Sequence, residues 1–227
     1  MKKHAKLAIY SWLLAFLLPA CSTVKVQEPQ NSLAALEPGE AVTVVLSYYS
    51  GAEAHAVENS INKCVTKAVH QANPSDKVIP PDEFRRVVFP DLEFSEAPHS
   101  VESFKLLLDD PTFLDRIAPL GLRYLVIASS TNREDKNTWG HCSAGYMSLA
   151  CLGGVVWDKS SQIAGVILDL KQARTLPAEL SATASGKSEF GFFIIVPYAF
   201  RADTRSAACD VFGKAVAKAI VSGGAKP

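Results

Sequence analysis

The run LRYLVIAS, residues 122–129, is almost continuously apolar and rich in β-branched and aromatic side chains. Such a composition predicts a β-strand. Three further runs share this character, at residues 41–49, 162–170 and 190–197, and a further strand is predicted at residues 179–188, where small and polar side chains alternate. We infer that all five strands belong to one sheet.

Two long amphipathic helices flank this set of strands. Residues 54–72 place apolar side chains at three- and four-residue spacing, with Glu58 and Lys63 off that stripe, and end at Asn73 and Pro74. Ser50 and Glu53, just before, form a capping-box pattern. Residues 204–222 repeat the apolar spacing and end at two glycines.

Residues 77–120 contain several short helical patterns separated by prolines, and they predict a helical insert. A short patch, EFRRVVF, ends at Pro90, and a second helix is predicted from Ser100 to Asp109. Asp110 and Pro111 provide an N-cap and a first-turn proline for a third. The predicted fold is α+β: a mixed, largely antiparallel sheet with both long helices on one face, a two-layer sandwich forming a single domain over residues 41–222.

The N-terminus has the pattern of a signal peptide. Lys2, Lys3 and Lys6 precede an uncharged stretch, LAIYSWLLAFLL, at residues 7–18, which is short for a membrane span. We therefore assign residues 1–20 to a signal peptide. Residues 22–40 are polar, contain two prolines and show no sustained period, so residues 21–40 are predicted to be a modified N-terminus followed by a tether.

Leu18, Pro19, Ala20 and Cys21 resemble the lipobox of bacterial lipoproteins, although most lipoboxes carry a small residue where Pro19 stands. The resemblance implies that Cys21 becomes the first residue of the mature chain and carries a diacylglyceryl thioether and an amide-linked acyl chain such as palmitate. Several acyl chains make a firm membrane anchor. Ser22, where inner-membrane lipoproteins commonly have aspartate, implies the outer membrane.

A second resemblance covers most of residues 41–222. Behind the lipobox, the segments GLRYLVIAS (121–129), AGVILDLKQARTL (164–176) and SATASGKS (181–188) precede an alanine-rich last helix. This order is similar to envelope lipoproteins of the curli-secretion and penicillin-binding-protein activator types, and to the amino-terminal domain of the Tol periplasmic protein. It implies an assembly, secretion or regulatory module without catalysis. The helical insert departs from that pattern.

The chain has five cysteines, and lipidation of Cys21 leaves Cys64, Cys142, Cys151 and Cys209. Four cysteines in an oxidising compartment allow three pairings. Cys142 and Cys151 bound a glycine-containing segment, whereas Cys64 and Cys209 fall on the apolar sides of the two long helices. We therefore predict the disulfides Cys142–Cys151 and Cys64–Cys209. The alternative is four buried free thiols.

The segment GHCSAG, residues 140–145, is the closest approach to a nucleophile motif. It supports an alternative function, an envelope hydrolase or thiol-dependent enzyme using His141 and Cys142. However, adjacent side chains on an extended segment point apart, and oxidised cysteines bind no metal, so we expect no catalytic residue, no metal and no cofactor. Asp169, alone in an apolar strand, is a candidate site residue, but more often such a carboxylate lies at a sheet edge or accepts a hydrogen bond from a neighbouring backbone amide.

Residues 143–157, SAGYMSLACLGGVVW, are apolar and carry no charge. They predict either a loop packed on the core and locked by the Cys142–Cys151 bond, or an exposed hairpin that contacts a membrane or another subunit. In the second case the interaction segment comprises Tyr146, Met147, Leu149, Leu152, Val155 and Trp157.

Charge excludes one class of partner. The chain has 23 basic and 23 acidic residues, and the three lysines before Cys21 leave 20 basic against 23 acidic residues in the mature part. This balance does not favour nucleic acid. The sequence therefore predicts a non-enzymatic binding or scaffold module of the bacterial cell envelope. Its expected partners are the outer membrane, through the lipid anchor on the periplasmic side, and other envelope proteins or further copies of itself.

Overall fold

The computed structural model describes residues 22–29, 33–47, 54–93, 96–145, 148–172, 177–193 and 196–221, apart from the side chains of residues 141–152 and 192–198. The chain forms two compact units. The layered unit comprises Val24–Asn132, Ser161–Ala184 and Arg205–Pro227. The ribbon unit comprises the described residues of Arg133–Ser160 and Ser185–Thr204, together with Ser22 and Thr23.

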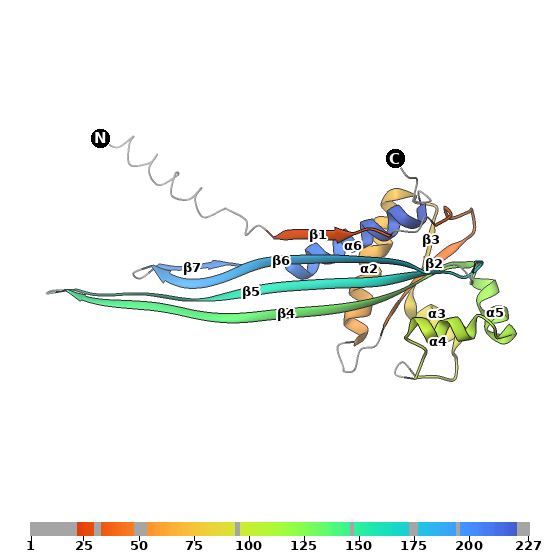
Figure 1. The fold of residues 1–227 in the computed structure, drawn as a ribbon, viewed down its shortest axis with the longest axis horizontal. Coiled ribbons are helices and arrows are strands. Elements are labelled where there is room, and N and C mark those ends of the chain that lie inside the picture. Colours follow the sequence, from red (N-terminus) through yellow and green to blue (C-terminus); the bar gives the residue numbers. More distant parts are fainter. Residues whose placement is uncertain are drawn as a thin grey trace. The chain divides into compact units, whose positions relative to one another are not determined.

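Seven strands form one mixed sheet in the order β1-β6-β5-β4-β2-β3, with β7 also pairing with β6 (Figure 1). The α+β class predicted from the sequence is confirmed. The bounds of the strands are β1 Thr23–Gln27, β2 Ala41–Leu46, β3 Lys77–Ile79, β4 Leu122–Gly145, β5 Ser148–Asp169, β6 Ala178–Phe193 and β7 Val196–Phe200.

Part of the sheet is parallel, where the sequence analysis expects mostly antiparallel pairing. Strand β2 pairs parallel with β3 on one side and with β4 on the other, whereas β6 and β7 are antiparallel. Parallel neighbours need long crossover connections. The helix after β2 and the helical insert after β3 supply them, so the insert is a crossover between core strands.

The two long helices, α2 (Ala54–Ala72) and α6 (Thr204–Val221), contribute to one hydrophobic cluster with β2, β4, β5 and β6. Both follow their predicted ranges closely, which confirms the periodicity argument. The helices approach closely at Gly213, because a Cβ atom there would lie 2.6 Å from the carbonyl oxygen of Cys64. A glycine at this position is required by the contact.

The helical insert covers a second hydrophobic cluster, built with β2, β3, β4 and β5. Its helices are α3 (Pro81–Val88), α4 (Val101–Leu107) and α5 (Pro111–Ile117). The rings of Phe84 and Phe89 pack edge to face with their centroids 6.0 Å apart, and the rings of Phe89 and Phe113 stack with their centroids 6.1 Å apart. Since helices cover two different clusters on one sheet, the layered unit has three layers, and the two-layer prediction is wrong. Strand β2 is accordingly buried at every residue.

The predicted N-terminal starts of α4 and α5 are confirmed, whereas α3 begins two residues before the predicted patch and α4 ends at Leu107. The Ser100 hydroxyl accepts a hydrogen bond from the amide of Ser103 at 3.0 Å, and Asp110 accepts one from Thr112 at 2.9 Å. Pro111 occupies the first turn of α5. Gly121 ends the following 3-10 turn (Ala118–Leu120) with a φ of 65°, a conformation that other residues rarely adopt.

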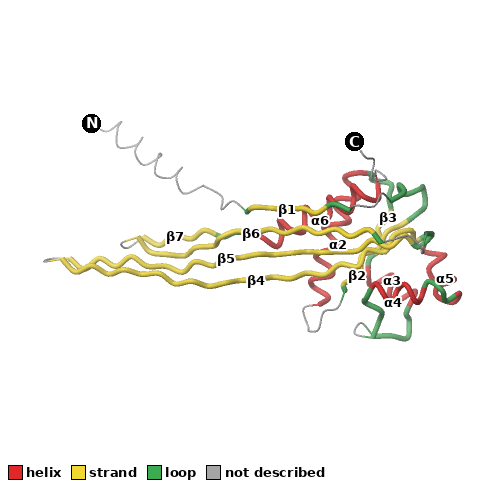
Figure 2. Tube along the Cα trace, in the orientation of Figure 1, coloured by secondary structure: helices red, strands yellow, loops and turns green. Residues whose placement is uncertain are grey.

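Two segments contain more regular structure than the sequence predicts. Residues 23–27, expected to be tether, form β1, and residues 130–145 and 148–161 extend β4 and β5 well beyond the predicted strands (Figure 2). In β1 and in residues 131–140 of β4, every residue except Val24 is exposed. Because strand prediction depends on one face being buried, such strands leave no apolar alternation to detect.

Candidate functional site

The structure brings one pair of predicted site residues together. The Sγ atoms of Cys64 in α2 and Cys209 in α6 are bonded, and their Cα atoms lie 5.8 Å apart. This is the pairing that the sequence analysis predicts. The bond joins residues separated by 145 positions and fixes the two long helices to one another.

Most of the other predicted site residues lie outside what the structure describes. Cys21, Tyr146 and Met147 are outside the described residues, as are Ser50 and Glu53. The remaining members of the segment lie in β4 and β5, where Val155 and Trp157 are half-buried, and no side chain is described for His141, Cys142, Leu149, Cys151 or Leu152.

Backbone register supports the predicted Cys142–Cys151 bond. Glu134 forms an ion pair with Lys159 at 3.5 Å, and a Cβ on Gly153 would lie 3.6 Å from the Cα of Gly140. Residue numbers therefore rise along β4 as they fall along β5, and the same register places residue 142 opposite residue 151. Directly opposed residues are within the reach of a disulfide. The bond itself stays a prediction.

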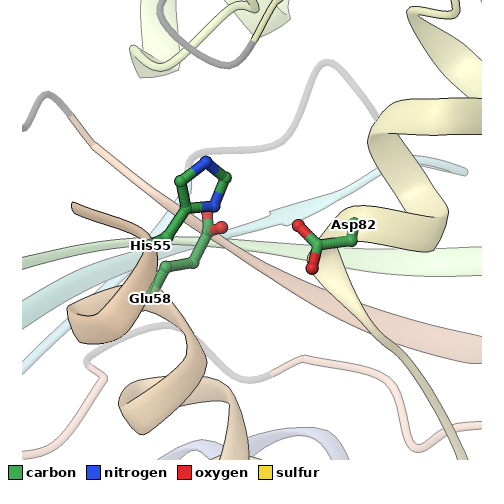
Figure 3. A group of neighbouring side chains, drawn as sticks. All are labelled: His55, Glu58 and Asp82. Atoms are coloured by element: carbon green, nitrogen blue, oxygen red, sulfur yellow. The ribbon is translucent and has the colours of Figure 1, made fainter. Parts of the chain in front are cut away.

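A buried carboxylate lies at the carboxyl end of β2 (Figure 3). Glu58 is 1% exposed and accepts a hydrogen bond from the amide of Leu46 at 2.9 Å. Arg85 of α3 donates to both Glu58 oxygens, at 2.8 and 2.6 Å, and to Asp82 at 2.7 Å. Burial opposes the charge of Arg85, but the hydrogen bonds and charge of Glu58, and then of Asp82, outweigh burial and raise its pKa.

His55, Glu58 and Asp82 lie close enough to hold a metal ion, since their ligand atoms fall within 4.8 Å of one another. The Arg85 guanidinium, however, already bonds both carboxylates. An arginine remains protonated at any relevant pH and cannot release them by losing its charge. The cluster is therefore better suited to joining α2, α3 and β2 than to binding a cation.

A second ionic cluster is centred on Arg123, at the start of β4. Its guanidinium donates to Asp169 at 2.8 Å and contacts Glu40 at 3.4 Å, and all three residues are buried. Lys171 also pairs with Glu40. Burial opposes the charge of Arg123, but Asp169 and then Tyr124 and Glu40 raise its pKa. The Arg123 side chain thus compensates two buried carboxylates.

The interpretation of Asp169 from the sequence is confirmed. Its Oδ1 atom accepts hydrogen bonds from the amides of Lys171 at 3.0 Å and Gln172 at 3.1 Å. Its ionic partner was not predictable from the sequence, because Arg123 lies 46 positions earlier within an apolar strand. Similarly, Glu58 is off the apolar stripe of its helix, and nothing local distinguishes it from a solvated residue. Only the packing of α3 on α2 reveals it.

Glu40 predicts a pH-dependent contribution to stability. Burial raises its pKa, but the amide of Glu37 and the charges of Lys171 and Arg123 outweigh burial and hold the pKa below its usual 4.5. A carboxyl whose pKa is lowered on folding stabilises the native state at pH values above its pKa in the unfolded chain. This stabilisation is lost as the pH falls through its pKa in the folded protein. The wild-type protein should therefore have a higher free energy of unfolding than the Glu40→Gln variant at pH 7, and this difference should be smaller at pH 3. Urea denaturation of both proteins at the two pH values measures this difference. An equal difference at pH 7 and pH 3 contradicts the prediction. The control is Glu102→Gln, on the exposed side of α4.

Open cavities lined by described residues occur in both units. In the layered unit, a cavity of about 330 Å³ lies beside the carboxyl end of β2 and is lined by Ser47, Ser129, Gln162, Glu179 and Ser181. In the ribbon unit, one of about 610 Å³ is lined by charged residues of both signs.

Comparisons with known proteins do not assign this chain to a family. No family model matches it. No curated protein matches it either. Among solved structures, the PelC dodecamer from Paraburkholderia phytofirmans has 11% sequence identity and a TM-score of 0.41, covering 88% of this chain and 99% of that chain. The Evf virulence factor has 12% identity and a TM-score of 0.15, covering 81% and 83% of the two chains. Neither likeness supports a conclusion about function.

In the described part of the chain, no helix is long and apolar enough to cross a membrane.

Proposed function

We propose that this chain is a lipid-anchored binding or scaffold module of the bacterial cell envelope, attached to the outer membrane through Cys21 and facing the periplasm, without catalytic activity. The observation that carries the proposal is the Cys64–Cys209 pair, with its Cα atoms 5.8 Å apart. Such bonds persist in oxidising compartments outside the cytoplasm. The basic and apolar N-terminal segment, ending at Cys21, provides the route to that compartment.

The ionic clusters support a binding role over a catalytic one. Glu58 and Asp169, both buried, are each held by an arginine. A general base needs a proton affinity near the working pH and access to its substrate. Both carboxylates are buried and already bonded to arginine, so they lack the access to substrate that a general base requires, and their contacts join strands and helices.

The full-length chain and a Cys21→Ala variant test the proposal. Cells expressing each are fractionated, and the intact mass of the mature protein is measured. We expect a product that begins at Cys21 with the added mass of acyl chains, and we expect Cys21→Ala to leave the membrane fraction. A membrane-free wild-type protein that begins near Ser22 would contradict the anchor and the location together.

A further inference from the structure

The described side chains of the ribbon unit form no hydrophobic cluster among themselves. Among its described side chains, Ala202 is the one buried hydrophobic residue, while Trp139 is 43% and Phe190 40% exposed. Every residue of β4 from 133 to 140 is exposed. A sheet normally buries one face against another layer, and isolated strands are marginal in water. The unit therefore has the character of a surface that acquires contacts in an assembly.

Strand β4 also presents an open edge in this unit. Its ladder with β2 ends at the Leu46–Ala128 pair, and the sheet places no other described strand on that side. A Cβ on Gly153 of β5 would lie 3.4 Å from the carbonyl oxygen of Trp139, so the odd-numbered residues direct their backbone groups toward β5. Because these directions alternate along a strand, Glu134, Lys136 and Thr138 direct their amides and carbonyls toward the open edge.

The charged side chains on this edge are complementary to those on the same edge of a second copy of the chain. Arg133 and Asp135 share one face of β4, and Glu134 and Lys136 share the other. If a second β4 runs antiparallel with the two Glu134 residues opposed, Arg133 of each copy lies opposite Asp135 of the other. These are non-hydrogen-bonded pairs, in which side chains approach most closely. Cross-strand pairs of opposite charge stabilise a sheet.

The same register relieves a repulsion within one chain. The β4–β5 register places Asp135 opposite Asp158, and like charges at opposed positions are destabilising. Lys187 pairs with Asp158 at 3.6 Å. Arg133 of a second copy would provide the corresponding cation for Asp135. The two opposed Glu134 side chains at the symmetry axis would each retain Lys159, their ion-pair partner at 3.5 Å.

We propose that two copies of this chain pair through residues 133–136 of β4, antiparallel and about a twofold axis at Glu134, to form one continuous sheet. Twofold interfaces are the most frequent in soluble oligomers and require a self-complementary surface. The charges on both faces of these residues favour a protein strand over lipid as the occupant. The inference names the partner of the proposed envelope module, and its role there rests on that proposed function.

Charge reversal tests the pairing on the full-length chain in detergent extract, with mass measured by analytical ultracentrifugation. Each single variant, Arg133→Asp or Asp135→Arg, places two like charges opposite one another at both 133–135 pairs of the dimer. We expect each to raise the dimer dissociation constant at least tenfold. The double variant restores opposite charges and should return the constant to near the wild-type value. Asp115→Arg, on the exposed side of α5, makes the same charge change away from the edge and should leave the mass unchanged.

A cysteine scan fixes the register. Glu134→Cys places two thiols at the axis, within the distance of a disulfide, and should give a reducible dimer. Lys136→Cys separates the equivalent atoms by four residues, about 14 Å, and should give none. The pairing is wrong if wild type sediments as a monomer, if the single reversals leave its mass unchanged, or if Lys136→Cys cross-links and Glu134→Cys does not.

The two proposals fail separately. A chain that carries acyl mass at Cys21 but remains monomeric overturns the pairing alone. A dimer that responds to the charge reversals but carries no acyl mass overturns the anchor alone. An assembly whose mass follows the detergent used, and not the charge of residues 133 and 135, contradicts the pairing and indicates contact with lipid.

Discussion

Removing the bond between the two long helices is expected to produce the largest loss of stability. The Cys64→Ala/Cys209→Ala variant should have a free energy of unfolding lower by roughly 3 to 5 kcal/mol, because the bond closes a loop of 145 positions and restricts the unfolded chain. Urea denaturation followed by circular dichroism measures the difference.

The control separates the bond from the packing of the side chains. Cys209 is 2% exposed, so its replacement by alanine also removes buried contacts. Wild type unfolded in a reducing agent loses the bond but keeps every atom of both side chains. If reduced wild type is nearly as stable as the oxidised protein, the loss in the variant comes from packing, and the bond contributes little.

The second large effect is expected at Arg123. The Arg123→Met variant keeps much of the side-chain volume but leaves Asp169 and Glu40 buried without their shared cation. Breaking a buried ion pair from one side costs roughly 3 to 5 kcal/mol. Arg86→Met, on the exposed side of α3, should change the free energy of unfolding by less than about 0.5 kcal/mol.

Acid distinguishes an electrostatic cause from a packing defect at Arg123. The charge of Arg123 is among the causes that lower the pKa of Glu40, so this part of its contribution to stability is lost as acid protonates that carboxyl. The deficit of Arg123→Met should therefore shrink between pH 7 and pH 4. A deficit of equal size at both pH values would show that the alkyl chain, and not the charge, supplies the stability.

The sequence predicted the elements whose burial follows a simple period. Helices α2 and α6 each keep an apolar stripe and end at strong stop signals, so their observed ranges differ from prediction by a residue or so. The short insert helices were marked by Ser100, Asp110 and Pro111, because caps act locally.

Features that depend on distant residues were not predictable in the same way. The parallel pairing of β2 depends on which face each crossover takes, and the polar half of β4 pairs without being buried. Arg123 and Glu58 become ionic centres only when another element packs on them. The cysteines were the exception, since pairing leaves few combinations to consider.

The position of Cys209 has a consequence for biogenesis. Proteins are made from the N-terminus, and Cys209 lies in α6, the last helix, whereas Cys64 lies in α2, near the beginning. A chain truncated anywhere before α6 lacks Cys209 and cannot close this bond. The Cys64–Cys209 disulfide is therefore a covalent mark that only a chain carrying its last helix can acquire.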